Sequence, residues 1–111
     1  MTRQLKNVIA GASVESASGV TQDLINPTTG EVFAKSPVSN AADVDAAYAA
    51  ASEAFTSWRD TTPSQRQAAL MAIADTFEAH KDELVELEGE NTGKAEGVTM
   101  AEEIPPMLDQ I

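Results

Sequence analysis

NAADVDAAYAAASEAFTSW, residues 40–58, is the stretch of the chain with the clearest helical pattern. Its large apolar side chains recur every three or four residues, which places them on one face of an α-helix. Asn40 and Asp43 stand three residues apart at its start, as in a capping box. The pattern predicts a helix over about 41–58 whose apolar stripe packs into a core. The stripe consists of Val44, Tyr48, Ala51, Phe55 and Trp58.

A second helix is predicted after a short break. Thr62, Pro63 and Gln65 suit the N-cap, N1 and N3 positions of a helix. The apolar side chains that follow again lie on one face. Together with Phe55 and Trp58 of the first helix, we expect them to be the best buried of the chain. They are Leu70, Ile73 and Phe77.

The pattern beyond the second stripe leaves two arrangements open. Apolar residues continue past His80, so a single long helix fits, and so does a break with a new start near Asp82. We favour the break, because one helix reaching Glu90 is long for a domain of this size. Gly93 then suits the C′ position that ends the helix.

The end of the chain carries another helical signal. Residues 95–103 predict a short helix, and Pro105 and Pro106 either break it or start a new one. Residues 107–111 begin an apolar pattern without a cap, which we interpret as a helix that is cut short.

The N-terminal part predicts short strands joined by turns. Residues 5–35 contain three extended runs, and the cluster at 26–30, Asn-Pro-Thr-Thr-Gly, is a dense turn signal between the last two. The chain is therefore predicted to be α+β, with a short antiparallel β-meander followed by three or four helices. We expect strands in residues 1–38 and a helical region in 39–111, which together form one incomplete domain.

The composition excludes several classes of function. Seven Lys+Arg against 18 Asp+Glu give a formal net charge of −11 at pH 7, which repels nucleic-acid phosphates and anionic membranes. The absence of cysteine excludes a disulfide, a thiolate metal site and a thiol nucleophile within these residues. The first residues carry no apolar signal segment, and we expect a cytoplasmic protein.

The titratable residues form no recognisable active site. The only histidine, His80, is interpreted as a partly solvated residue at a helix end. The carboxylates alternate with leucines on a predicted helix. This pattern indicates the solvent-exposed face of the helix rather than an acid–base pair. They are Glu83, Glu86, Glu88 and Glu90, with Glu102 and Glu103 further on. The six glycines never fall into a phosphate-binding loop of the GxGxxG or GxxxxGK type.

Two stretches resemble the opening of the aldehyde dehydrogenase superfamily. The first begins with LINPTTGEV at 24–32 and continues through 44–58, and the second runs from Leu84 to NTGK at 91–94. Each motif is weak alone, but their order and separation are specific. The resemblance extends over about residues 5–111.

This resemblance carries expectations about cofactor and activity. It implies NAD(P) as the cofactor of the full-length family. The family's cysteine nucleophile, glutamate base, asparagine oxyanion donor and NAD-binding unit lie further along a longer chain, so this chain is not expected to be active alone. Its tail, EIPPMLDQI at 103–111, is similar to the aminobutyraldehyde and betaine-aldehyde dehydrogenase branch, whose substrates are aminoaldehydes.

The resemblance also implies a monovalent cation site for K⁺ or Na⁺. The matching positions are the carbonyls of Leu24 and Ile25, together with Asn91. Asn91 replaces the family's aspartate, so the site loses a charge but keeps neutral oxygens, which a hard cation accepts. The alternative is that Asn91 caps the end of its helix.

The sequence thus favours one function and leaves two alternatives. The favoured one is an N-terminal piece of an aldehyde dehydrogenase whose apolar helix faces bind the remainder of that enzyme. The first alternative is a stand-alone acidic interaction module of the same origin that binds another protein through those faces. The second is an unrelated acidic helical domain, which predicts a different arrangement of strands and helices.

Overall fold

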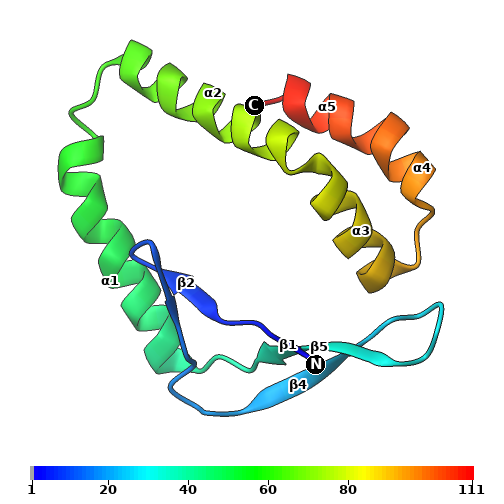
Figure 1. The fold of residues 1–111 in the computed structure, drawn as a ribbon. Helices are drawn as coiled ribbons and strands as arrows, with labels where there is room; N and C mark the ends of the chain where they lie inside the picture. The colour runs from blue at the N-terminus through cyan, green and yellow to red at the C-terminus, as the bar shows by residue number, and fades with distance from the viewer. Residues whose placement is uncertain (1) are drawn as a thin grey trace. The chain divides into compact units, whose positions relative to one another are not determined.

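The strands come first along the chain and form two small sheets (Figure 1). In one sheet, β5 (Val32–Pro37) lies between β1 (Arg3–Gln4), which runs parallel to it, and β4 (Thr21–Ile25), which runs antiparallel. The other sheet is the antiparallel hairpin of β2 (Asn7–Ile9) and β3 (Ala12–Val14). The computed structural model describes residues 2–111.

The predicted α+β class is confirmed, but the strands do not form one continuous meander. Ala10 and Gly11 both have positive φ, 52° and 75°, as a two-residue hairpin turn of type I′ requires. This turn folds β2 back directly onto β3, so the hairpin closes on itself. The edge of β5 is instead paired by β1, from the very start of the chain.

Helix α1 (Ala41–Trp58) begins and ends where the pattern predicted. The Asn40 side chain accepts the N–H groups of Ala42 and Asp43 at 3.0 and 3.2 Å, and the Asp43 carboxylate accepts the N–H of Asn40 at 2.9 Å. This reciprocal capping box satisfies donors that the first helical turn leaves without partners.

Helix α2 (Pro63–Ala79) is capped in the same way. The Thr62 hydroxyl accepts the N–H of Gln65 at 3.3 Å, and the Gln65 side-chain oxygen accepts the N–H of Thr62 at 2.8 Å. Thr62 and Gln65 therefore both take part in the capping box that the sequence predicted.

We expect Thr62→Ala to lower the free energy of unfolding by about 1 kcal/mol, because an N-cap hydroxyl is lost. Thr76→Ala, in the same helix, is the matched control. Its hydroxyl donates only to the carbonyl of Ala72, so alanine should raise stability by a few tenths of a kcal/mol through helix propensity. Urea unfolding followed by circular dichroism measures both, and equal effects would contradict the capping role.

The favoured break between the second and third helices is confirmed, and it falls at His80. The N–H of His80 donates to the carbonyls of Thr76 and Phe77, while its own carbonyl accepts from Leu84. Helix α3 (Lys81–Thr92) therefore follows α2 after a single non-helical residue.

Prolines shape the last helical segment, which comprises α4 (Glu96–Val98), a π-helical turn (Thr99–Glu103) and α5 (Ile104–Asp109). Pro105 and Pro106 bring no N–H to the helical ladder, which leaves carbonyls one turn earlier without donors. The chain widens there, and the N–H of Ile104 donates to a carbonyl five residues back. Within this region α5 packs against α2 (Figure 1).

The described residues divide into two compact units. One consists of the residues up to Ile25 together with Glu31–Asp60, and the other consists of Asn26–Gly30 and Thr61–Ile111. The change from strands to helices falls between Pro37 and Ala41, near the predicted boundary of residues 1–38 and 39–111. The compact units divide the chain differently, since α1 groups with the strands and the 26–30 turn groups with the later helices.

The prediction of the best-buried side chains is wrong. Phe55, Trp58, Leu70 and Ile73 are 46–57% exposed, and Phe77 is half-buried. The buried apolar residues among those described are small or medium in size: Ala34, Val85 and Ile104. Periodicity identifies an apolar stripe, but a stripe is buried only where another element covers it.

Candidate functional site

The turn Asn26–Gly30 is held by its own first residue. The Asn26 side-chain oxygen accepts the N–H of Thr28 at 2.9 Å, and the Asn26 carbonyl accepts the N–H of Gly30 at 2.8 Å. Asparagine is suited to this position because its short side chain can bond to the backbone two residues on. Local hydrogen bonds therefore set the shape of the first motif on which the resemblance depends.

Gly93, from the second motif, lies directly against this turn. It ends α3 with φ of 74°, in the left-handed region, and donates its N–H to the carbonyl of Gly89 at 2.9 Å. A Cβ atom at Gly93 would lie 3.1 Å from Cγ of Pro27 and 3.2 Å from Oγ1 of Thr28. Glycine is thus favoured twice, by the backbone conformation and by the close approach of the turn.

Lys94, next to this contact, fixes the loop that follows α3. Its Nζ lies 2.5 Å from a Glu103 oxygen and 3.7 Å from a Glu88 oxygen. The hydrogen bond to Glu103 is the main cause that raises the pKa of Lys94 above its ordinary value. The Thr-Gly-Lys sequence therefore directs its ammonium to carboxylates of its own chain. Because these side chains are partly exposed, the ion pairs contribute more to positioning than to stability.

A second polar cluster, in the other unit, centres on the buried carboxylate of Asp43. Besides capping α1, it accepts the hydroxyl of Ser16 at 2.7 Å and the N–H of Ala17 at 2.8 Å. The Ala17 hydrogen bond, followed by those of Ser16 and Asn40, holds the pKa of Asp43 below its ordinary value. The sequence identified Asp43 only as a cap, because nothing in the pattern marks a partner 26 residues earlier.

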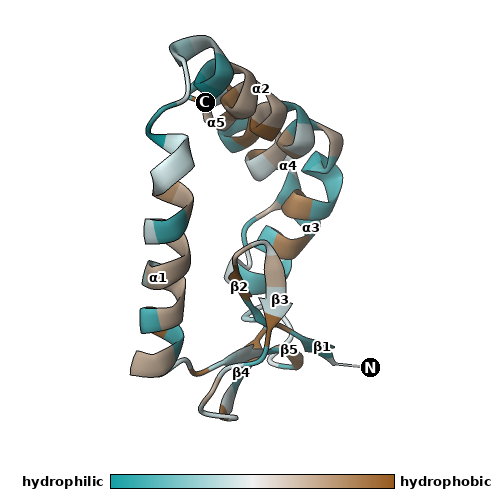
Figure 2. Ribbon diagram, turned by 90° about the vertical axis from the view of Figure 1, so that its left-hand side faces the viewer, coloured by the Kyte–Doolittle hydropathy of each residue, from teal (hydrophilic) through white to brown (hydrophobic). Residues whose placement is uncertain are grey.

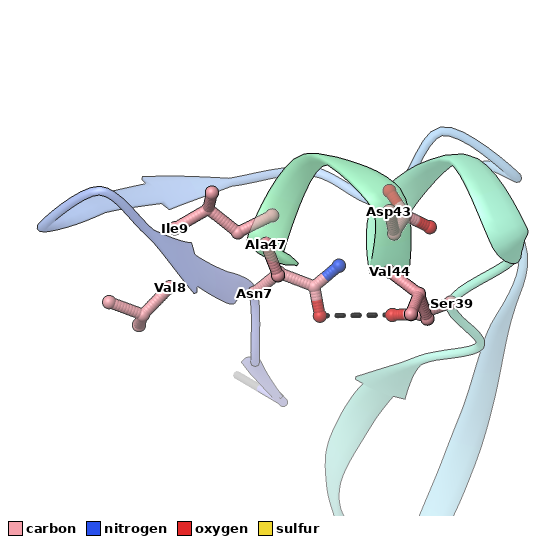
Figure 3. Close-up of a pocket in the computed structure, with 7 residues that line it drawn as sticks. All are labelled: Asn7, Val8, Ile9, Ser39, Asp43, Val44 and Ala47. Carbon is pink, nitrogen blue, oxygen red and sulfur yellow. Dashed lines mark hydrogen bonds between the residues drawn. The ribbon is translucent and has the colours of Figure 1, made fainter. Parts of the chain in front are cut away.

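A shallow groove of about 220 Å³ lies between β2 and the start of α1 (Figure 3). Asn7 points from β2 toward the helix, and its side-chain oxygen accepts the Ser39 hydroxyl at 3.0 Å. The amide nitrogen of Asn7 is covered by protein and has no acceptor among residues 2–111. A covered donor cannot reach a ligand in the groove, so we assign no binding role to it.

The residues considered for acid–base chemistry do not line this groove and form no cluster of their own. His80 is at the α2–α3 junction, exposed, with Nδ1 3.4 Å from a Glu83 oxygen. Glu83 and Glu86 are exposed on α3, as predicted for its solvent-exposed face, while Glu88 and Glu90 are half-buried. Within residues 2–111, no three His, Asp or Glu side chains gather as a metal site would require. None of the helices in that range combines the length and apolar character that a bilayer crossing requires.

The residues of the implied cation site lie in two different elements. Leu24 and Ile25 end β4, where the pairing with β5 has an irregularity, and Asn91 is exposed in the last turn of α3. Leu24 and Ile25 belong to one compact unit and Asn91 to the other. The site therefore stays a prediction. Asn91 lies inside α3, and Gly93 takes the C-cap position.

Comparison with known proteins identifies the family. The model of the aldehyde dehydrogenase family matches residues 13–111, nearly the whole chain. The chain belongs to the aldehyde dehydrogenase family. The match includes both the Asn26–Gly30 turn and Gly93, so the contact between these motifs lies within the family region.

Curated relatives of this family are much longer than the chain. The putative aldehyde dehydrogenase DhaS of Bacillus subtilis is 40% identical over 108 residues, which are 96% of this chain and 22% of DhaS. Malonate-semialdehyde dehydrogenase 1 of Geobacillus kaustophilus is 39% identical over 94 residues, 85% of this chain and 19% of that protein. The chain thus spans about a fifth of the length of these relatives. Their names do not confirm the aminoaldehyde branch that the tail suggested.

Solved structures of the family share the fold. An NAD⁺ complex of Bacillus cereus aldehyde dehydrogenase gives a TM-score of 0.90 at 32% identity, covering 96% of this chain and 22% of that one. A γ-glutamyl-γ-aminobutyraldehyde dehydrogenase from Burkholderia cenocepacia gives 0.91 at 35% identity, covering 98% and 22%. The chain corresponds to the N-terminal part of such structures. The hypothesis of an unrelated acidic helical domain is therefore wrong.

Proposed function

We propose that this chain is the N-terminal part of an enzyme that oxidises an aldehyde to a carboxylate and passes a hydride to NAD(P). The observation that carries the proposal is the family match along residues 13–111, which contains the Gly93 contact with the turn. NAD(P) would accept the hydride in the whole protein. No residue of this chain is assigned to its binding.

The contribution of this chain is structural in this proposal. The 111 residues include no cysteine, so a thiol nucleophile has to come from outside them. What the chain offers is a capped helical framework and the turn that packs on Gly93. We also propose a cytoplasmic location, a reducing compartment that suits a chain whose 111 residues include no cysteine.

Aminoaldehydes are the proposed substrate class. Residues 103–111 carry the sequence similarity to that branch, and one structure of matching fold is named for an aminobutyraldehyde derivative. Malonate semialdehyde, an anion, is the second candidate, because several curated relatives are named for it. The two candidates differ in charge, so one assay separates them.

The test is to express whatever the reading frame encodes through and beyond Ile111 and to follow NADH formation. We expect a later cysteine and turnover that is faster with 4-aminobutyraldehyde than with malonate semialdehyde. The isolated 111-residue chain should stay at the buffer rate. A reading frame that stops at Ile111, or a complete protein without turnover on any aldehyde, would overturn the proposal.

The same assay tests the cation site, which we propose for K⁺ or Na⁺ at the carbonyls of Leu24 and Ile25 and at Asn91. All three groups offer neutral oxygens, which suit an alkali cation of low charge. Activity and thermal stability of the complete protein should be higher in KCl or NaCl than in choline chloride of the same ionic strength. Equal values in the three salts would count against the site.

A stand-alone interaction module is the second candidate function. Exposed apolar side chains on α1 and α2 favour it, because a contiguous apolar face usually marks a binding surface. This candidate requires a reading frame that ends near Ile111 and a protein that binds the isolated chain. Nucleic acids and membranes are not expected partners, given the net charge of −11.

A further inference from the structure

A hollow of about 290 Å³ lies between α3 and the segment that follows it, within the helical unit. Helix α3 contributes Asp82 and Val85, α4 contributes Glu96 and Gly97, and the π-helical turn contributes Met100. These elements contact one another (Figure 1). Figure 2 shows apolar positions of α3 alternating with hydrophilic ones. We call this space the α3–α4 hollow.

The floor of the α3–α4 hollow is apolar. Val85 is only 4% exposed and Met100 is half-buried. Gly97 brings no side chain, and a Cβ atom there would meet nothing within 4 Å. The volume lies near the lower end of the range for pockets that bind small molecules, about 300–1,000 Å³. The hollow therefore offers apolar contact to a short aliphatic chain.

Two carboxylates without partners stand at the hollow. The side chains of Asp82 and Glu96 are exposed, and neither forms a hydrogen bond or an ion pair with another of residues 2–111. The neighbouring lysines are held elsewhere, since Nζ of Lys81 lies 3.0 Å from an oxygen of Glu78 and Lys94 is bound by the carboxylates described above. The hollow thus has two negative charges and no cation of the same chain to neutralise them.

We propose that the α3–α4 hollow binds a small aliphatic diammonium ion, with one ammonium group at each carboxylate and the methylene chain over Val85 and Met100. Two positive charges match the two carboxylates, and each ammonium group offers three donors to their oxygens. The methylenes remove apolar surface of the floor from water. This inference goes beyond the proposed function and does not depend on it.

A protein partner fits the α3–α4 hollow less well than a small cation. A standard protein interface needs about 800 Å² on each side, with large apolar side chains at its centre. Among residues 81–103, Val98 is the only large apolar side chain that is exposed. The surface around the hollow therefore lacks the anchors that a protein interface requires.

Methyl NMR of the 111-residue chain tests the site with 1,4-diaminobutane as the probe. The chain has four methionines, so a ¹³C-methyl methionine label gives few signals, and the variant Met100→Leu assigns the one at the hollow. The Met100 signal should shift and saturate with a dissociation constant on the order of mM at low salt, as expected for a ligand this small. Met71, which is 53% exposed on α2, serves as the internal control and should not shift. NaCl of equal ionic strength corrects for screening.

Variants and a second ligand separate the site from the overall negative charge. The pair Asp82→Asn and Glu96→Gln should weaken binding about tenfold, and 1-aminobutane, which has one charge, should bind wild type about threefold more weakly than the diamine. The pair Asp45→Asn and Glu53→Gln on α1 makes the same change in net charge and should leave binding unchanged.

Gly97→Leu adds a side chain where the hollow is open and keeps every charge. It should weaken binding at least as much as removing the two carboxylates, provided that circular dichroism shows the chain folded. If the charge variants do not fold, this comparison and the two ligands still decide.

Several outcomes would overturn the proposal. Carboxylates that serve only the dipoles of their helices would give no saturable shift of Met100. Equal weakening by the α1 pair, or full binding to Gly97→Leu, would show attraction to net charge rather than a site. Tighter binding of the peptide Lys-Gly-Lys than of the diamine would assign the hollow to a protein side chain. Because the readout is a methyl signal, failure of the aldehyde assay leaves these results unaffected.

Discussion

Gly93→Ala should lower the free energy of unfolding by roughly 2–4 kcal/mol, the largest effect expected for a single methyl group in this chain. Two costs add. An L-residue in the left-handed region at φ of 74° is strained by about 1–2 kcal/mol. The new Cβ also meets Pro27 and Thr28 at 3.1 and 3.2 Å, closer than van der Waals contact, and the turn has to shift. Urea unfolding followed by circular dichroism measures the sum.

Two other glycines separate these costs. Gly30 has φ of 76° but open space around its Cβ position, so Gly30→Ala should show the backbone strain alone, about 1–2 kcal/mol. Gly97 has neither positive φ nor a close neighbour, and alanine there should be neutral or stabilise by up to about 1 kcal/mol. Equal losses for Gly93→Ala and Gly30→Ala would show that the contact with the turn contributes nothing.

A double-mutant cycle assigns the contact to its partner. Thr28→Ala removes the hydroxyl that lies 3.2 Å from the new Cβ, so Gly93→Ala should cost less in that background. Additive effects of the two substitutions would contradict the packing of Gly93 on Thr28.

Asp43→Ala should destabilise the first unit more than any other substitution in its polar cluster. Its carboxylate accepts hydrogen bonds from two places in the chain: the hydroxyl of Ser16 with the N–H of Ala17, and the N–H of Asn40. Alanine leaves these donors without their acceptor in a covered position. Asn40→Ala removes only a helix cap and should cost about 1 kcal/mol. Fluorescence of Trp58, at the end of α1, follows unfolding of this unit.

The Asp43 cluster should also make stability depend on pH in a defined direction. The pKa of Asp43 is lower in the folded chain than its ordinary value, so the folded state binds this proton less readily than the unfolded state. The stabilisation is therefore fully present above about pH 4, near the unfolded pKa, and is lost as the pH falls through the folded pKa. The difference in stability between wild type and Asp43→Asn should shrink below about pH 4. A difference that is constant with pH would contradict the role of the carboxylate.

The helix boundaries show how much of this fold is predictable. The start of α1 at Ala41, the start of α2 at Pro63 and the end of α3 before Gly93 all follow from capping residues within four positions of the boundary. The break between α2 and α3 was expected near Asp82 and lies at His80. These features depend on neighbours in the chain, so local sequence contains the information that places them.

The candidate sites were only partly predictable. Asn26–Gly30 and Thr92–Lys94 were identified as motifs, but a pattern gives no distance between residues that lie more than 60 positions apart. The partners of Asp43, Ser16 and Ala17, likewise lie 27 and 26 positions earlier in the chain, beyond the reach of a local pattern. Pairing of β1 with β5 is a further case, because two short strands at that separation have no local signal for each other.

The sequence by itself determined the family, the order of strands and helices, and the apolar stripe on α1, since all of these follow from residue types at short, regular spacings. Only the tertiary structure decided that the stripe is exposed, that Gly93 packs on the turn and that Asp43 bonds to Ser16 and Ala17. The physical reason is that burial and long-range hydrogen bonds depend on which surfaces meet, and a side chain of any hydrophobicity stays in solvent until another surface covers it.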